Sequence, residues 1–452
     1  VYCTGQYTVS GAYDYGTVKY DAAGNQLWLK TYNGPGNGYD PSVSIAVDNA
    51  GNVYVTGYSL GSGTGYDFAT IKYDAAGNEL WVKRYHGGND YGLSLAIDNS
   101  GNVYVTGTNG SDYITIKYDA AGNELWIRAF DGGSGWDEAR SVAVDNTGNV
   151  YVGGRSQGIG GFDYATVKYD AAGNQLWARR YNGPTNGSDE IRKIAVDNTG
   201  NVFVTGQSAG SGTGDDYVTV KYDASGNELW AKRYNGPGNR EDVPLGIKVD
   251  NSGNCFITGV CAGTGGSLDY DYATIKYDAA GNEIWNRRYD GPANNNDGAY
   301  AIAIDDDGNV YVSGGSIGVG TGTDFATIKY DADGTEKWAI RYNNSAVNGE
   351  DYGLYTMSLD PYGNVVVCGT SEGATSSYDY LTIKYSQDEN TRAFVDLVKI
   401  YGAGNNKATF GYKFDHDENI SIGADNRFIP APEDRGQTTA FTAGTHHDLF
   451  EV

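Results

Sequence analysis

Aspartate residues at two fixed places of a recurring pattern are the side chains whose type and spacing could do chemistry. One set stands just before segments of the type Ala-Thr-Ile-Lys-Tyr and consists of Asp14, Asp67, Asp112, Asp163, Asp216, Asp271, Asp324 and Asp379. The other set stands before segments of the type Ser-Leu-Ala-Ile and consists of Asp40, Asp90, Asp137, Asp189, Asp242, Asp297 and Asp351. Carboxylates gathered on one rim would collect calcium or a cationic ligand.

A structural role for these aspartates is the interpretation that the pattern favours. An Asp that recurs at a fixed place is what a turn cap would look like, or a partner of the repeated Lys72 and Arg84. A binding site normally breaks a repeat, whereas these residues follow it. We retain as binding candidates the residues that lie where the connecting loops vary, namely Asp67, Asp112, Asp163, Asp216, Asp271, Asp324, Tyr66 and Tyr270.

Two short acidic runs resemble the start of an oxygen-ligand calcium loop. One contains Asp305 and Asp307, and the other contains Asp331 and Asp333. Neither run continues to the distal bidentate Glu of the EF-hand pattern, and both occupy ordinary hairpin positions. Calcium is the metal that these four residues would hold, and the sequence indicates no other cofactor. His86 has no Cys, His or carboxylate partner at zinc spacing, which predicts an ordinary surface residue.

The sequence contains no recognisable catalytic constellation. It has only 4 His in 452 residues, and it lacks a Gly-x-Ser-x-Gly elbow, a phosphate-binding loop and a His-Glu-x-x-His motif. Carboxylates are so plentiful that a paired-acid glycosidase or lyase stays open as an alternative, yet nothing singles out a pair. A protein that is not an enzyme is therefore the favoured interpretation.

A pentapeptide of the type Val-Tyr-Val-Thr-Gly recurs about every 50 residues and sets the architecture. Its copies begin at Val1, Val53, Val103, Val150, Val202, Cys255, Val310 and Val365. Each period is rich in β-branched and aromatic residues and contains Asp-x-x-Gly-Asn runs that are typical of tight hairpins. It predicts four short strands, here called a (Ser-Leu-Ala-Ile), b (the pentapeptide), c (Thr-Ile-Lys-Tyr) and d (Trp-Val-Lys-Arg).

Four antiparallel strands in each of several periods predict the blades of a β-propeller. The runs Asp-x-x-Gly-Asn-Val-Tyr-Val-Thr-Gly and Ala-Thr-Ile-Lys-Tyr-Asp-Ala-Ala-Gly-Asn-Glu-Leu-Trp resemble the bacterial SBBP-type β-propeller repeat, over about residues 1–385. The resemblance implies the fold and a secreted or cell-surface protein. It implies little about function, because such scaffolds serve many tasks.

We expect an all-β chain: an eight-bladed β-propeller of four-stranded antiparallel blades with a small C-terminal β tail. The chain begins within a blade, at strand b, and only seven d strands carry the usual Trp. Residues 397–401 align with residues 81–85 and would supply the eighth d strand. The propeller is therefore assigned to residues 1–401, with its last outer strand at about 394–401, and residues 402–452 to a small β appendage or strand-donating tail.

The first blade lacks a strand a in this sequence. Residues 407–414 of the same chain could fill it and seal the propeller, as could residues upstream of Val1 that this chain lacks. A strand from a neighbouring chain would instead make a polymer, because an unpaired edge is a template for β-augmentation. The sequence does not choose between these alternatives.

Four cysteines stand at positions 3, 255, 261 and 368. Cys3 and Cys368 lie in the b strands of the first and eighth blades, which become neighbours when the propeller closes. Strand alternation points the two thiols to opposite blade faces, and adjacent blades meet through opposite faces. We therefore predict a closing disulfide between them, with two small buried apolar side chains as the alternative.

The 32 basic and 57 acidic side chains give a net charge of −25, which argues against a nucleic-acid partner or an anionic membrane surface. No apolar run approaches the roughly 18 to 20 residues of a membrane helix. We expect a non-enzymatic, extracellular or cell-surface protein that binds a protein or glycan with its variable-loop face. The first alternative is a filament or surface-layer subunit joined to its own copies by C-terminal strand donation. The second is a carbohydrate-active enzyme.

Overall fold

The computed structural model consists of β-strands. It describes residues 1–9, 12–133, 135–265, 269–344, 349–372, 378–387, 393–402, 405–409, 427–428 and 441–442. Across these residues there is no helix, and so none that could span a membrane. Eight successive antiparallel sheets form blades, which confirms the predicted eight-bladed β-propeller. Two blades depart from four strands, because the first has three and the eighth has five.

The first compact unit comprises residues 1–257 and 275–284. Its three-stranded blade is formed by β1 (Tyr2–Val9), β2 (Ala12–Tyr20) and β3 (Gln26–Tyr32). Four complete blades follow, formed by β4 (Ser42–Val47), β5 (Val53–Leu60), β6 (Tyr66–Tyr73), β7 (Glu79–Tyr85); β8 (Tyr91–Ile97), β9 (Val103–Thr108), β10 (Tyr113–Tyr118), β11 (Glu124–Phe130); β12 (Asp137–Val144), β13 (Val150–Gln157), β14 (Phe162–Tyr169), β15 (Gln175–Tyr181); and β16 (Asp189–Val196), β17 (Val202–Ala209), β18 (Asp215–Tyr222), β19 (Glu228–Tyr234).

The second compact unit comprises residues 258–274 and 285–452. One blade contains residues of both units and is formed by β20 (Val243–Val249), β21 (Cys255–Ala262), β22 (Tyr270–Tyr277) and β23 (Glu283–Tyr289). The remaining strands are β24 (Asp297–Ile304), β25 (Val310–Gly318), β26 (Gly322–Tyr330), β27 (Glu336–Tyr342); β28 (Asp351–Leu359), β29 (Val365–Glu372), β30 (Tyr378–Gln387), β31 (Ala393–Gly402), β32 (Asn405–Thr409); and the pair β33 (Arg427–Phe428) and β34 (Phe441–Thr442).

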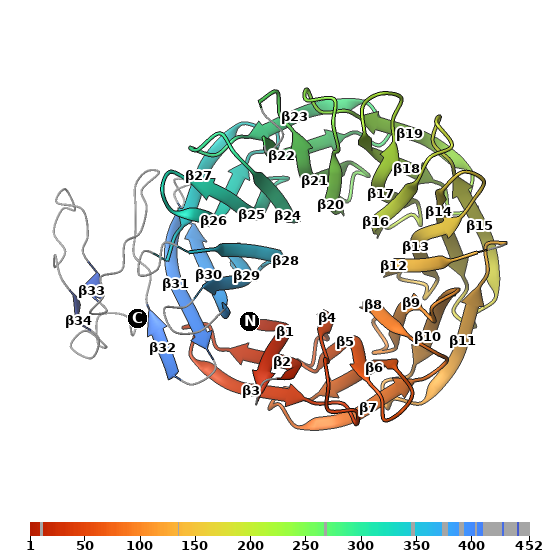
Figure 1. Ribbon diagram of the computed structural model, residues 1–452, viewed down its shortest axis with the longest axis horizontal. Coiled ribbons are helices and arrows are strands. Elements are labelled where there is room, and N and C mark those ends of the chain that lie inside the picture. The colour runs from red at the N-terminus through yellow and green to blue at the C-terminus, as the bar shows by residue number, and fades with distance from the viewer. Residues whose placement is uncertain are drawn as a thin grey trace. The chain divides into compact units, whose positions relative to one another are not determined.

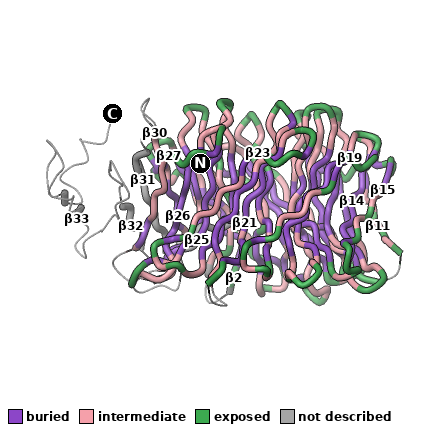
Figure 2. Tube along the Cα trace, turned by 90° about the horizontal axis from the view of Figure 1, so that it is seen from above, coloured by how far each residue is buried: buried purple, intermediate pink, exposed green. Residues whose placement is uncertain are grey.

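The central and outer strands of a blade differ in how far their residues are buried. The pentapeptide residues of β5 and β9 are buried throughout, whereas the outer strand β7 has no fully buried residue. Figure 1 shows the complete blades of the first unit side by side, with β4, β8, β12 and β16 on the inner side and β7, β11, β15 and β19 on the outer side. Figure 2 shows that buried residues run along the strands and that exposed residues gather at the turns.

The pentapeptide ends in glycine because a neighbouring strand approaches it closely. Strand a bulges opposite this residue, between Ser42 and Ser44 in the second blade. A Cβ on Gly57 would lie 2.1 Å from the carbonyl oxygen of Pro41 and 2.8 Å from the Tyr15 hydroxyl. No side chain fits there, so the repeat requires glycine at this place.

The Asp-x-x-Gly-Asn hairpins are closed by their own aspartate. In the turn between β6 and β7, Asn78 donates from its backbone and its side chain to the two carboxylate oxygens of Asp74, each over 2.8 Å. Gly77 takes a φ of +84°, which favours glycine. Each turn is thus specified by local residues, which explains why the hairpins could be predicted.

Neighbouring blades are joined by one repeated contact. Trp126 of β11 packs between Tyr104 of its own blade and Tyr169 of the next, with ring centroids 6.2 and 6.0 Å apart. The Trp126 indole and the Lys117 ammonium both donate to the carbonyl oxygen of Ala171, over 3.2 and 3.0 Å. The repeated Trp and Tyr side chains therefore form the interblade core.

The C-terminal strands bear on one of the alternatives for the first blade, in which residues 407–414 supply its strand a. β31 pairs with β30 so that Leu397 lies opposite Lys384, the register in which Trp81 lies opposite Lys72. Residues 407–409 lie in β32, which pairs with the outer strand β31 and leaves strand a of the first blade unfilled. The inner edge of β1 and the outer edge of β31 were both open to a further strand. β32 joins β31, which directly precedes it along the chain. Residues 410–414 lie outside the described residues.

Candidate ligand-binding face

The aspartates before strand c pair with the arginines of strand d. Arg84 donates to Asp67 over 2.6 Å and also to the Ser59 hydroxyl over 2.7 Å. The corresponding pairs are Asp163–Arg180 at 3.0 Å, Asp216–Arg233 at 2.8 Å, Asp324–Arg341 at 2.7 Å and Asp271–Arg288. Five of the six candidate aspartates thus act as the arginine partners that repetition indicated. Asp112 differs, because Ala129 stands at the place of the arginine.

The aspartates before strand a tie one blade to the next. Asp40 accepts hydrogen bonds from the Gly34 and Leu60 amides over 2.8 and 2.7 Å, and its own amide donates to the Tyr13 carbonyl over 2.7 Å. Asp90, Asp137, Asp189, Asp242 and Asp297 accept from the corresponding glycine amides. Each blade junction therefore brings two aspartates together, one from either blade.

Burial of Asp90, Asp297 and Asp351 disfavours their ionised form. Burial raises the pKa of Asp297 and of Asp351 to about 6, and the neighbouring Asp324 raises that of Asp351 further. Burial also raises the pKa of Asp90, to which the carboxylate of Asp67 adds. Asp90, Asp297 and Asp351 thus take up a proton more readily than an exposed aspartate does.

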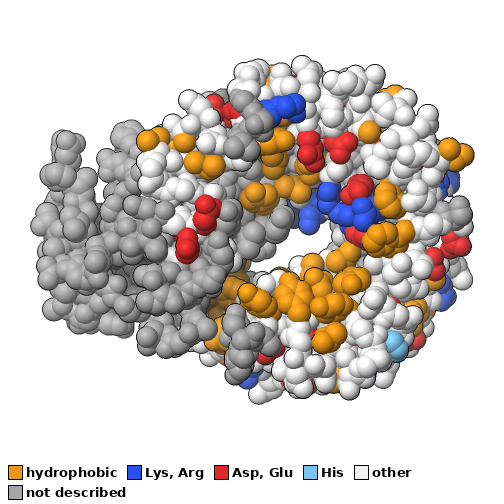
Figure 3. All heavy atoms as spheres, viewed as in Figure 1, with side chains coloured by type: hydrophobic (Ala, Val, Ile, Leu, Met, Phe, Trp, Pro, Cys, Tyr) orange, Lys and Arg blue, Asp and Glu red, His pale blue; other side chains and the backbone are white. Residues whose placement is uncertain are grey.

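Five partly exposed tyrosines meet beside the first junctions, and we call them the tyrosine cluster: Tyr13, Tyr39, Tyr58, Tyr66 and Tyr91. The Tyr58 ring lies 5.4 Å from that of Tyr66 and 5.0 Å from that of Tyr91, centroid to centroid. Tyr39 joins them to Tyr13, at 6.2 Å from Tyr58 and 5.7 Å from Tyr13. Figure 3 shows hydrophobic side chains gathered where β4, β5 and β8 lie in Figure 1.

A charged group occupies the same face where β12 and β16 lie, and we call it the arginine–glutamate cluster: Glu138, Arg140, Arg155, Glu190 and Arg192. Arg155 contacts Glu190 over 2.6 Å and Glu138 over 2.8 Å, and Arg140 contacts the same two glutamates over 3.3 and 2.9 Å. The Arg155 guanidinium also stacks on Phe162, 4.6 Å from its ring centroid. Red and blue side chains mark this group in Figure 3.

The family model of the SBBP beta-propeller repeat matches this chain at residues 31–63, 126–163 and 176–212. The chain carries SBBP beta-propeller repeats. The matched segments run through β3 to β5, β11 to β14 and β15 to β17, and they include the junction aspartates Asp40, Asp137, Asp163 and Asp189.

Solved structures share the fold at low sequence identity. Sqt1 from Chaetomium thermophilum is 12% identical with a TM-score of 0.50, and the match covers 89% of this chain and 92% of that chain. A second structure of Sqt1 from the same organism is 10% identical with a TM-score of 0.50, and the match covers 83% of this chain and 88% of that chain. A protein from Lactobacillus plantarum is 14% identical with a TM-score of 0.45, covering 91% and 97%. Comparison with curated proteins finds no match. These likenesses concern the fold alone.

The two clusters occupy the same places of the SBBP repeat. Tyr58 and Arg155 are both the sixth residue of strand b, and Tyr66 and Phe162 both open strand c. Tyr66 was a candidate from the sequence, and Tyr270 takes its place at the start of β22. The other members were missed, although their signal is visible: these places vary while their neighbours repeat.

The structure corrects the expectation for His86. Its Nδ1 atom lies 3.2 Å from the Asp67 carboxylate, so a carboxylate partner exists although it stands 19 residues away in the sequence. Within the described ranges, three groups bring their ligand atoms within 4.8 Å of one another, namely Asp67, His86, Asp90; Asp112, Asp131, Asp137; and Asp271, Asp290, Asp297. Each combines a junction pair with the residue that follows strand d.

The weak calcium candidates lie in ordinary SBBP hairpins. Asp305 accepts from the Asp307 and Asn309 amides over 3.1 and 2.8 Å, and Asp331 accepts from the Asp333 amide over 3.1 Å. The aspartates Asp305 and Asp331 thus close their own turns, as Asp74 does. Calcium binding by these four residues stays a prediction.

The cysteines fall into two kinds. Cys3 and Cys368 are disulfide-bonded, and Cys255 and Cys261 are free and buried. The predicted pairing of Cys3 with Cys368 stays a prediction. Peptide masses of the non-reduced protein should contain a crosslinked pair that disappears on reduction, and its absence would contradict the pairing.

Proposed function

We propose that this SBBP-repeat propeller is a non-enzymatic binding protein that binds a protein or glycan. The binding face is the one formed by the loops between strands b and c and between strands d and a. One observation carries the proposal: the repeats keep the residues that build the junctions and vary those that cover them. Variable residues on a rigid repeated scaffold are where binding specificity is usually found.

The tyrosine cluster supplies the chemistry for such binding. Its rings are half exposed, so each offers an apolar face and a hydroxyl to a ligand, at low cost in conformational entropy. The Tyr39 hydroxyl accepts a hydrogen bond from the Gln6 amide over 2.6 Å, which holds one ring in place. Because the chain carries a charge of −25, we expect the ligand to be neutral or positively charged.

The proposal includes a location outside the cell or at its surface. Two cysteines that are disulfide-bonded support it, because disulfides persist mainly in oxidising compartments. Fractionation of the source cells with an antibody against the chain would test this part by itself. Recovery of the protein from the cytoplasm alone would contradict it.

Binding to a glycan array and to isolated cell-surface proteins tests the function. The double variant Tyr39→Ala and Tyr66→Ala should lose at least tenfold in affinity for whatever the wild type binds. Tyr362→Ala is the matched control, because this tyrosine is 88% exposed in a hairpin between β28 and β29. Equal binding by all three proteins would overturn the proposed site, and turnover of a bound polysaccharide would favour the enzyme.

An open strand edge favours the filament subunit as the second candidate. Among the described residues, β1 pairs with β2 and no strand pairs with its other edge. Such an edge can accept a strand from another copy. Electron microscopy of the full chain beside a chain lacking residues 402–452 tests this alternative, since fibres that vanish with the tail would support it.

A further inference from the structure

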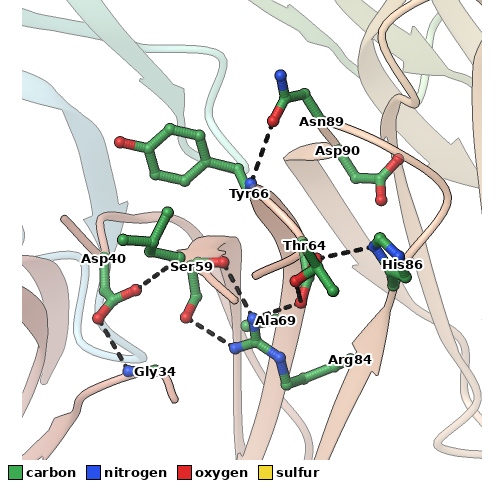
Figure 4. Close-up of polar contacts among 12 residues, drawn as sticks. Gly34, Asp40, Ser59, Thr64, Tyr66, Ala69, Arg84, His86, Asn89 and Asp90 are labelled. Atoms are coloured by element: carbon green, nitrogen blue, oxygen red, sulfur yellow. Dashed lines mark hydrogen bonds and ion pairs between the residues drawn. The ribbon is translucent and has the colours of Figure 1, made fainter. Parts of the chain in front are cut away.

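His86 stands between two carboxylates that come from neighbouring blades. Asp67 opens β6, His86 follows β7, and Asp90 precedes β8. The three ligand atoms lie within 4.8 Å of one another, and Figure 4 shows the Asp90 carboxylate directed toward His86. The two aspartates are buried, with 4% and 0% of their surface exposed, whereas half of the His86 side chain is exposed. The group is therefore a fixed acidic pair with an imidazole that closes it toward solvent.

The Asp90 carboxylate has an oxygen without a partner. Its Oδ2 atom accepts hydrogen bonds from the Gly87 and Gly88 amides over 2.5 and 3.1 Å. Its Oδ1 atom is buried and has no hydrogen-bond partner within the part of the chain that the structure describes. Other junction aspartates, such as Asp163 and Asp189, also have an unsatisfied Oδ1 atom, and Asp90 differs from them because an imidazole lies beside its carboxylate. An unsatisfied buried carboxylate oxygen next to a nitrogen donor points to a ligand that both would hold.

The other aspartate is also left with one oxygen for a ligand. Arg84 and the Thr64 hydroxyl both donate to Oδ2 of Asp67, over 2.6 and 3.3 Å. Among the described residues, the His86 ring is the one group that approaches Oδ1. The arginine therefore orients the carboxylate without occupying the atom that faces His86, and the two carboxylates with one guanidinium keep a net charge of about −1.

We propose that Asp67, His86 and Asp90 bind a divalent transition-metal ion such as Zn²⁺ through one atom each, with the remaining position open to solvent. In a tetrahedral zinc site with bonds of about 2.0 to 2.2 Å, neighbouring donor atoms lie about 3.3 to 3.5 Å apart. The observed separation of 3.2 Å between His86 Nδ1 and Asp67 Oδ1 is close to this value. Binding requires the imidazole to be neutral, which frees its Nδ1 lone pair for the ion.

The repeat itself shows why the ion is a transition metal. The place of His86 holds asparagine or aspartate in the other repeats, namely Asn33, Asp131, Asn182, Asn235, Asp290 and Asn343. Calcium prefers oxygen ligands, whereas imidazole suits zinc, copper and nickel. The exchange of an oxygen donor for a nitrogen donor at one junction therefore shifts the preference away from calcium. The proposal does not depend on the proposed function, although the site adjoins Tyr66 and Tyr91 of the tyrosine cluster.

Titration of the chelator-treated full chain, without a histidine tag, tests the site. Zn²⁺ is added in a calorimeter, and bound zinc is counted by mass spectrometry after dialysis. His86→Asn installs the residue that other junctions carry, so the fold should persist, and it should remove one bound ion or weaken its affinity at least tenfold. Asp131→Asn is the matched control, because it removes a carboxylate from the same place of the next junction, and its zinc affinity should stay within twofold of wild type.

Nuclear magnetic resonance of the imidazole nitrogens gives a second measurement. If His86 had only a structural role, zinc would not change its nitrogen resonances. The chain has only 4 His, so the His86 signal is the one lost in His86→Asn. Zinc should shift the Nδ1 resonance of His86, and calcium should not. Wild-type protein that binds no zinc, equal zinc binding by His86→Asn, or a loss of zinc in Asp131→Asn would each overturn the assignment.

Discussion

The tyrosine cluster and the arginine–glutamate cluster lie on the same backbone and present opposite chemistry. Tyr58 pairs with Phe68 across β5 and β6, and Arg155 pairs with Tyr164 across β13 and β14, in the same register. At this place of the repeat, Tyr58 presents an uncharged, partly exposed ring, whereas Arg155 presents a guanidinium that contacts two glutamates. The comparison teaches that the repeat fixes the backbone and leaves the chemistry of this face free to change.

The two clusters also differ in how their members depend on one another. Each tyrosine contacts other rings and keeps part of its surface in water, so removal of one ring leaves the others satisfied. Glu190 is only 9% exposed and depends on Arg140, Arg155 and Arg192 for its partners. A buried charge that loses its partner costs far more than a ring that loses a neighbour.

The largest expected effect falls on both regions equally. Gly57→Ala and Gly154→Ala should each destabilise the protein by about 3 kcal/mol or more, because the new Cβ would lie 2.1 or 2.0 Å from a backbone carbonyl oxygen. Urea unfolding measures the loss. Gly153→Ala is the control, since its Cβ would meet the Ile191 side chain at 3.1 Å. A large loss in one region alone would show that the two backbones are not equivalent.

The next effect separates the regions. Arg155→Met should cost about 2 to 4 kcal/mol, because Glu138 and Glu190 would lose one of the two arginines that contact them both. Tyr58→Met at the same place of the repeat should cost about 1 kcal/mol or less. Urea unfolding at low and high salt checks both, and only the first loss should depend on salt. Equal losses would mean that the charges of the second cluster are not coupled.

The strand topology could be predicted from the sequence because its determinants are local. The hairpin of Asp74 and Asn78 is closed by residues four apart, and the pentapeptide alternates within one strand. The candidate face was inferred from the variable loops, and its role in binding stays a prediction. What the sequence could not provide was the contact of His86 with Asp67 and Asp90, because these residues meet only when two blades stack.

The same limit explains two other results. The arginine–glutamate cluster combines side chains from β12, β13 and β16, which no spacing along the chain reveals. The pairing of β32 with β31 was missed because strand propensity does not state which unpaired edge a strand joins. Local chemistry fixes the elements, and only packing fixes their partners.

Acid should reveal the buried aspartates of other junctions in the same repeat. Burial holds the pKa of Asp297 and Asp351 at about 6, so ionisation opposes folding above pH 6 and this cost disappears as the pH falls toward 4. Hydrogen bonds from Asn78 hold the pKa of Asp74 below 3.8, so its contribution is present above that pH and is lost below it. Thermal unfolding should therefore occur a few degrees higher near pH 5 than at pH 7, and lower again near pH 3. A steady decline from pH 7 downward would contradict this prediction.

The smallest effect is expected from a substitution that copies the proposed metal site into the other region. Asn182→His places an imidazole beside Asp163 and Asp189, next to the arginine–glutamate cluster, and the Oδ1 atom of Asp163 is buried without a partner. A second zinc ion per chain is expected, within tenfold of the first in affinity, by the same titration. The absence of a second ion would show that the tyrosine region contributes more to the site than its three ligands.

In each of several blades, one backbone carbonyl oxygen accepts hydrogen bonds from a tryptophan and a lysine of the neighbouring blade. This repeated contact has a consequence for engineering. Lys72 donates to Ala120, Lys117 to Ala171, Lys168 to Ala224 and Lys221 to Ala279, over 2.8 to 3.0 Å. Because these contacts are the same from blade to blade, blades two to five behave as exchangeable modules. Transplanting one blade in place of another would carry its face residues with it, and so would move specificity without redesign of the junction.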